Sequence, residues 1–210
     1  MSSSGAALVQ DDYNPWEMLR TWQFYVLWFM YACGAGAGLV IISKLAMMAL
    51  VQSGVSLGFV LVAVLAVGNG AGRIVAGVLS DRVGRKATLI LFFMVQAVSI
   101  LLLSQARTGS ALGTNLVLAA LSALIGASYG ANLALFSSIT KDYYGIRNFG
   151  VNYGLVFTAW GLGGFMLSLL AGKVYDMTQT FTFAYYCSAT LLVVAALMTF
   201  VLRPLPQKAE

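Results

Sequence analysis

The sequence predicts an all-α membrane protein with six transmembrane helices, on the evidence of its composition, its apolar runs and the placing of its charges. The chain has 210 residues, of which 60% are hydrophobic and 9% are charged. A soluble domain carries about 25% charged residues. The apolar runs are long enough to cross a hydrocarbon core of roughly 30 Å. We therefore expect lipid, rather than water, to surround most of this chain.

Six apolar segments follow one another, and the charged residues gather in the short gaps between them. Short gaps imply that neighbouring helices run antiparallel. The first 15 residues are polar and lack the basic start and apolar core of a signal peptide. We expect a flexible tail at 1–15, a helical domain at 16–203 and a second tail at 204–210. The predicted spans are 22–43, 55–79, 88–105, 112–138, 149–172 and 181–202.

The lysines and arginines are divided unequally between the two sides of the membrane. Eight fall on one side and three on the other. Because basic residues concentrate in cytoplasmic loops, we expect both termini in the cytoplasm, in a bacterial inner membrane. The eight are Arg20, Arg82, Arg85, Lys86, Lys141, Arg147, Arg203 and Lys208, and the three are Lys44, Arg107 and Lys173.

Several classes of function find no support in this sequence. The chain has no histidine, and its two cysteines, Cys33 and Cys187, lie in apolar segments. We therefore expect no metal site and no disulfide framework. The scattered basic residues form no nucleic-acid-binding stripe. The spans contain no carboxylate pair and the chain has no nucleotide-binding motif, so we predict neither an enzyme nor a bound cofactor.

Arg73 is the one charged residue within the otherwise apolar segment 55–79. It lies eight residues before Asp81, which is roughly 12 Å at about 1.5 Å per residue. An arginine at that depth is costly in lipid and cannot lose its charge. It must face protein, water or an anion, so we predict a site for a small anion. The alternative is a structural arginine paired to another helix.

Glycine pairs spaced four residues apart recur within the spans. Small residues at this spacing let helix backbones approach closely. We expect them to mark contacts between helices. The pairs are Gly34 with Gly38, Gly68 with Gly72, and Gly126 with Gly130.

A charged motif follows the second span, and it reads Gly77-Val-Leu-Ser-Asp81-Arg82-Val-Gly84-Arg85-Lys86. It resembles the G-x-x-x-D-R-x-G-R-K signature of the major facilitator superfamily, found in the cytoplasmic loop between the second and third helices of a six-helix half. Glycine permits the tight turn that this loop needs. The resemblance implies a gating loop that latches one side of a transporter. The alternative is an ordinary basic loop. The implied gating residues are Gly77, Asp81, Arg82, Gly84, Arg85 and Lys86.

Further stretches resemble the C-terminal six-helix half of one superfamily branch, that of oxalate/formate antiporters and monocarboxylate transporters. They begin at Tyr13-Asn-Pro-Trp, Tyr129-Gly-Ala-Asn and Asn148-Phe-Gly-Val. The resemblance implies one half of a major facilitator fold, carrying small carboxylates by alternating access. Its partner would be an N-terminal six-helix half or a second copy of the chain. The rival interpretation is a non-transporting orphan half, or an assembly or regulatory membrane subunit.

The same resemblance implies which residues bind substrate. Arg73 would pair with the carboxylate, and Asn69, one turn earlier, would orient it or contact the substrate. Tyr129, Phe157 and Trp160 would wall the site, unless they serve only packing. An oxalate antiporter carries a lysine at the place of Trp160. A single positive charge in this half then favours a monocarboxylate, such as formate or lactate, over oxalate.

Overall fold

A computed structural model of the protein describes residues 12–54, 56, 58–203 and 205, so most of the predicted tail at 204–210 lies outside it. Within these residues the regular secondary structure is entirely helical. Six of the helices are long and apolar enough to cross a membrane, which confirms the predicted fold class. The elements are α1 (Pro15–Leu19), α2 (Trp22–Ser53), α3 (Gly58–Val83), α4 (Arg85–Ser104), the 3-10 turn η1 (Ala111–Gly113), α5 (Asn115–Tyr144), α6 (Phe149–Thr178) and α7 (Thr182–Val201).

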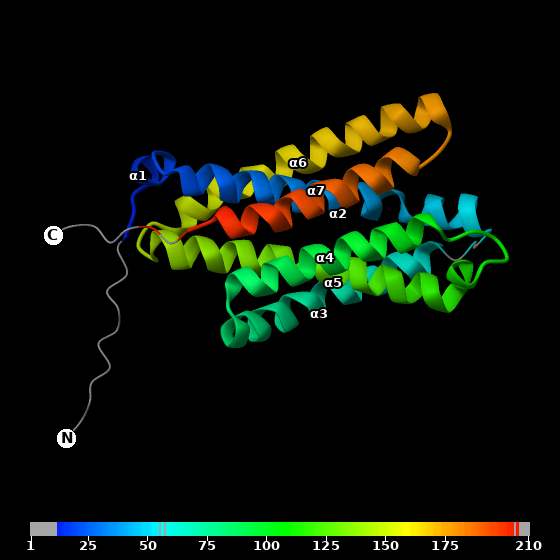
Figure 1. Cartoon of the computed structure of the whole chain (residues 1–210), viewed down its shortest axis with the longest axis horizontal. Coiled ribbons are helices and arrows are strands. Elements are labelled where there is room, and N and C mark those ends of the chain that lie inside the picture. Colours follow the sequence, from blue (N-terminus) through cyan, green and yellow to red (C-terminus); the bar gives the residue numbers. More distant parts are fainter. Residues whose placement is uncertain (1–11, 55, 57, 204, 206–210) are drawn as a thin grey trace, which may run out of the picture.

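The six long helices run side by side as a bundle, each antiparallel to the next along the chain (Figure 1). The helix α1, the α3–α4 and α5–α6 connections and the last turn of α7 all lie at one end. We call this the basic end. The described residues Arg20, Arg82, Arg85, Lys86, Lys141, Arg147 and Arg203 lie at or near these helix ends.

Four helices continue past the predicted ends of their spans, among them α3, which reaches Val83, and α4 begins three residues before its predicted start, at Arg85. The helix α2 continues past Lys44 to Ser53 and stops at Gly54, whose φ of 69° is left-handed. Its last turn is held by Gln52, whose carbonyl accepts from the Thr108 amide (3.0 Å) and whose side chain accepts from the Tyr185 hydroxyl (2.9 Å). Hydropathy measures which residues tolerate lipid, whereas a helix continues wherever its backbone hydrogen bonds do. The helices α5 and α6 also continue past their predicted ends, to Tyr144 and Thr178.

The predicted tail is packed where the structure describes it. The buried Tyr13 donates its amide to the Tyr144 carbonyl (3.0 Å). Its own carbonyl accepts from the side-chain amides of Asn148 (3.1 Å) and Asn152 (2.9 Å) at the start of α6. Residues 1–11 lie outside the described part of the chain.

The glycine pairs mark helix contacts, as predicted. Between α3 and α5, glycines of each helix lie directly against the backbone of the other helix. A Cβ on Gly72 would collide with the carbonyl oxygen of Ala127, and one on Gly130 would collide with that of Asn69. The helices α2 and α6 meet in the same manner, since a Cβ on Gly163 would strike the Ala32 backbone.

The outer helices α3 and α6 are the least buried of the six. Within their most apolar windows, 22% and 28% of residues are buried, against 44% or more in the other four helices. Their open faces carry large apolar side chains, including Ile74 on α3 and Phe165 on α6. These two helices also carry four of the five residues predicted to bind substrate.

Candidate functional site

A cavity of about 530 Å³ lies between α3, α5 and α6. This volume is in the range of small-molecule sites, roughly 300–1,000 Å³. Four of the five residues predicted to bind substrate line it, and Asn69 does not. The lining residues are Arg73, Tyr129, Leu133, Ala134, Ser137, Tyr153, Phe157 and Trp160.

Arg73 reaches this cavity from α3 and is exposed within the chain. Its Nε donates to the side-chain oxygen of Asn69, one turn earlier, at 3.2 Å. In the described part of the chain the guanidinium forms no ion pair. It does interact electrostatically with Tyr129 and Tyr153. Asn69 therefore holds the Nε of Arg73, and the terminal nitrogens of the guanidinium donate to no group among the described residues.

The close packing of α3 on α5 brings the arginine to the aromatic wall. Gly130 sits directly on the Asn69 backbone, and the next residue before it on α5 is Tyr129. A larger residue at position 130 would push α3 away, because the contact is with backbone atoms. The glycine spacing thus fixes the lateral separation of Arg73 and Tyr129.

Three of the predicted residues form one aromatic cluster. The indole N–H of Trp160 on α6 donates to the Tyr129 hydroxyl on α5 at 2.6 Å. The Phe157 ring stacks on Trp160 with centroids 5.2 Å apart and planes at 10°. Because Tyr129 accepts from the indole, its own proton remains available to an anion.

Sequence reasoning missed four lining residues, namely Leu133, Ala134, Ser137 and Tyr153. The hydroxyl of Tyr153 lies 3.5 Å from that of the buried Tyr31 on α2. A signal was present, since Tyr153 precedes Phe157 by one helical turn and so shares its face. The helical spacing of Leu133 and Ser137 after Tyr129 carries the same signal on α5.

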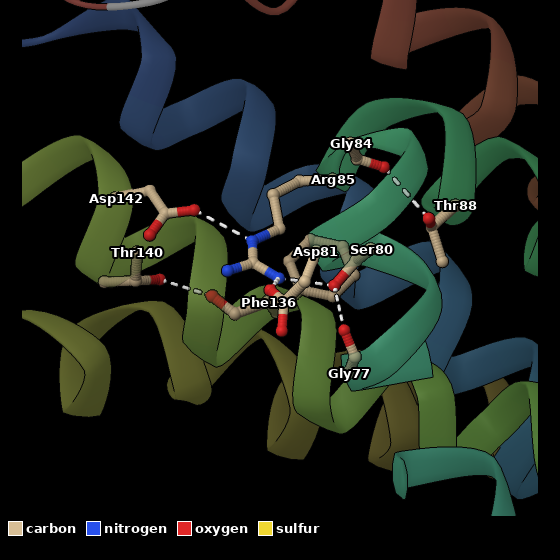
Figure 2. Close-up of polar contacts among 9 residues, drawn as sticks. All are labelled: Gly77, Ser80, Asp81, Gly84, Arg85, Thr88, Phe136, Thr140 and Asp142. Carbon is tan, nitrogen blue, oxygen red and sulfur yellow. Dashed lines mark hydrogen bonds and ion pairs between the residues drawn. The ribbon is translucent and has the colours of Figure 1, made fainter. Parts of the chain in front are cut away.

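The motif at the α3–α4 connection is compact (Figure 2). Gly84, with φ of 93°, is the single residue between the two helices. Asp81 and Arg82 therefore belong to the last turn of α3, and Arg85 and Lys86 to the first turn of α4. The expectation of a loop is corrected here, because one left-handed glycine suffices to reverse the chain.

Arg85 joins three helices at this connection (Figure 2). Its guanidinium contacts Asp81 on α3 at 2.6 Å and Asp142 on α5 at 2.9 Å, and it also donates to the Ser80 hydroxyl. The Ser80 hydroxyl in turn donates to the carbonyl of Gly77 (2.9 Å).

The other two basic residues of the motif differ in their contacts. Lys86 donates to the carbonyl of Leu202, just after α7. Arg82 is exposed and forms no ion pair with the described residues. The motif therefore ties the basic end together through Arg85 and Lys86.

The family model described as Major Facilitator Superfamily matches residues 24–210 of this chain. The chain belongs to this superfamily. Its relatives in the superfamily are transporters rather than enzymes. The predicted resemblance to the antiporter and monocarboxylate transporter branch is confirmed by the relatives it matches.

Three relatives illustrate the match. The chain is 30% identical over 202 residues to the oxalate:formate antiporter of Oxalobacter formigenes, covering 93% of this chain and 46% of the relative. It is 26% identical over 158 residues to the uncharacterized MFS-type transporter YhjX of Escherichia coli (strain K12), covering 74% and 38%. It is 29% identical over 147 residues to human monocarboxylate transporter 14, covering 68% and 27%. The chain spans less than half the length of these superfamily members.

Proposed function

We propose that this chain forms half of a secondary transporter that moves small carboxylate anions across the membrane by alternating access. One observation carries the proposal. Arg73 lines a cavity with aromatic walls and has no acidic partner in the described part of the chain. The planar donor fork of a guanidinium matches a carboxylate. The names of two relatives, an oxalate:formate antiporter and a monocarboxylate transporter, support the same substrate class.

The contacts of the site suggest how each residue acts. Asn69 holds the Nε of Arg73, so the terminal nitrogens can pair with both carboxylate oxygens. Tyr129 donates its hydroxyl proton to the anion, while Trp160 and Phe157 shield it from water. Asn69 cannot ionise, so proton coupling does not run through it. One fixed positive charge in this cavity suits a monocarboxylate, such as formate or lactate, better than oxalate.

Substitution of Arg73 tests the proposal. Lysine keeps the charge but loses the planar fork, so Arg73→Lys should lose most binding and uptake. The assay is radiolabelled lactate or formate binding by the purified chain, and uptake into liposomes. The matched control is Arg107→Lys, at an exposed arginine outside both the cavity and the charged motif, which should match wild type. Near wild-type binding by Arg73→Lys would remove Arg73 from the substrate site. A wild-type chain that binds and transports neither anion would favour the non-transporting half.

The basic end is proposed to face the cytoplasm of a bacterial cell. The charged motif, in which Arg85 pairs with Asp81 and Asp142, would act as the gate there. The positive-inside rule supports this orientation. Single cysteines test it, in a background in which Cys33 and Cys187 are serine. Arg82→Cys at the basic end should be protected from a membrane-impermeant maleimide in intact cells, and Arg107→Cys at the opposite end should react. Labelling of Arg82→Cys from outside would reverse the assignment.

A further inference from the structure

Tyr129 lines the cavity from α5, and α2 lies against the back of its ring. A Cβ on Gly38 would collide with Cδ2 of that ring and would lie 3.1 Å from its Cε2. Gly38 is buried and is not among the residues that line the cavity. It therefore lies behind the ring, on the side away from the cavity, and any side chain at position 38 would occupy the place that the ring now holds.

The side-chain amide of Gln96 on α4 is the second neighbour of Gly38. A Cβ on Gly38 would lie 3.0 Å from its Nε2. The Gln96 side chain is fully buried, and its Oε1 accepts from the side-chain amide of Asn132 on α5 at 3.3 Å. Loss of that bond would leave buried amide groups unpaired, which is costly. Gln96 is therefore not free to yield to a larger residue at position 38.

The other side of α2 is held against α6 by close backbone contacts. A Cβ on Gly36 would lie 2.7 Å from the carbonyl oxygen of Gly163, and one on Gly163 would collide with the backbone of Ala32. Gly36 and Gly38 are two residues apart, so they point to nearly opposite sides of the helix. Backbone atoms cannot rotate away from a contact as side chains can. α2 therefore has no room to retreat from Tyr129.

The Tyr129 ring is the neighbour of position 38 that is left to move, and its movement would reach Trp160. The Tyr129 hydroxyl accepts from the Trp160 indole at 2.6 Å, and this bond joins α5 to α6 in the cavity wall. A ring pushed from behind would carry its hydroxyl away from the indole N–H.

We propose that Gly38 is a positioning residue for Tyr129. The absence of a side chain at this point of α2 sets where the ring lies, and so maintains the hydrogen bond between Tyr129 and Trp160. The inference goes beyond the proposed function, because it concerns the wall of the cavity and holds whichever ligand the cavity binds.

Nuclear magnetic resonance of the indole N–H groups tests this inference without a ligand. The purified full chain, carrying isotopically labelled tryptophan, is measured in mild detergent, and the Trp160 resonance is identified by its absence in Trp160→Phe. Tyr129→Phe removes the acceptor, so the upfield shift of the Trp160 indole proton in that variant defines a broken bond. Trp28 provides an internal reference for the packing of α2 on α6, because its indole donates to the Thr158 hydroxyl (2.9 Å).

Gly38→Ala should move the Trp160 indole proton most of the way to its position in Tyr129→Phe, and leave that of Trp28 unchanged. An unmoved Trp160 resonance in Gly38→Ala overturns the inference. Because the spectrum is recorded without a ligand, this outcome says nothing against the proposed function.

The matched control is Gly34→Ala, one turn earlier on the same face of α2. Its added Cβ would lie 2.7 Å from the Phe93 ring and has no close contact with Tyr129. It also overpacks the bundle, yet should leave the Trp160 resonance at its wild-type position. Equal shifts in Gly34→Ala and Gly38→Ala would overturn the inference, since overpacking anywhere along α2 would then suffice.

A double-mutant cycle keeps the test decisive if Gly38→Ala does not fold. Tyr129→Ala removes the ring, so adding Gly38→Ala to it should lower the unfolding temperature much less than adding it to wild type. A loss as large as in the presence of the ring overturns the inference. Failure of the double variant to fold, when Tyr129→Ala alone folds, overturns it as well.

Discussion

Two arginines of this chain illustrate how position determines what the same side chain does. Arg85 lies at the basic end, where its guanidinium pairs with Asp81 and Asp142 and donates to the Ser80 hydroxyl. Arg73 lies within a membrane-spanning helix and finds only the amide oxygen of Asn69 among the described residues. A guanidinium with unused donors inside the membrane is costly. That cost is what makes Arg73 a candidate for binding an anion, whereas Arg85 joins helices.

Replacing Arg85 tests its joining role. Arg85→Lys keeps the charge but loses the planar fork of guanidinium donors. The lysine should therefore pair with one of the two aspartates rather than both. The side chains of Asp81 and Asp142 are 66% and 41% exposed, so water screens the pairs. We expect a loss of unfolding free energy of at most about 1 kcal/mol. Thermal unfolding in detergent measures it, and the loss should shrink at high salt.

The control for that measurement is Arg82→Lys, because Arg82 forms no ion pair with the described residues. It should unfold like wild type at both salt concentrations. A destabilisation that is the same for both variants would contradict the role assigned to Arg85.

At the scale of the helices, the α3–α5 contact connects packing to the site. Glycines from both helices bring the backbones together, with Gly72 over Ala127 and Gly130 over Asn69. The same contact sets the separation of Arg73 and Tyr129. Packing and site geometry are therefore coupled through one row of small residues.

Adding a single methyl group tests this coupling. Gly72→Ala places a Cβ against the Ala127 carbonyl, and overpacking of this kind costs about 1–3 kcal/mol. We expect a lower unfolding temperature in detergent and weaker anion binding. The control, Gly70→Ala on the same helix, has no atom within 4 Å of the added Cβ. It should unfold and bind like wild type, and equal effects of the two substitutions would refute the coupling.

At the scale of the whole molecule, α3 and α6 are the least buried of the six long helices and expose large apolar side chains. Arg73 lies on α3, and exposure of its charge to lipid would cost about 2.5 kcal/mol or more. Large apolar side chains surround it on these faces, among them Ile74 at 71% exposure. A second six-helix unit would cover them and close the cavity, whether it is an N-terminal half or another copy of the chain.

We therefore expect the chain to associate in mild detergent. Mass photometry or light scattering should give a protein mass above the 22.3 kDa of one chain, either alone or after co-expression with an N-terminal half. Ile74→Asn should weaken this association. Leu197→Asn, at a residue of α7 that is 60% exposed, should leave it unchanged. A stable monomer under both conditions would count against the proposed half-transporter.

Some features of this protein follow from its sequence because they depend on neighbouring residues. The number of spans follows from the length of each apolar run, since every backbone group in lipid must be bonded within its own helix. The depth of Arg73 follows from its distance to Asp81, and the contact glycines from their spacing. Each is a property of one helix and needs no knowledge of what packs against it.

Other features arise only when the helices pack. The bond from Trp160 to Tyr129 joins residues 31 positions apart, and the pairing of Arg85 with Asp142 spans 57 positions. Helical periodicity states which residues share a face, but not which face turns inward. The close approach of α3 to α5 and of α2 to α6 decides which face turns inward. Contacts along the whole length of two helices contribute more to this packing than any single side chain does. Ser137 and Tyr153 became visible as cavity-lining residues for the same reason.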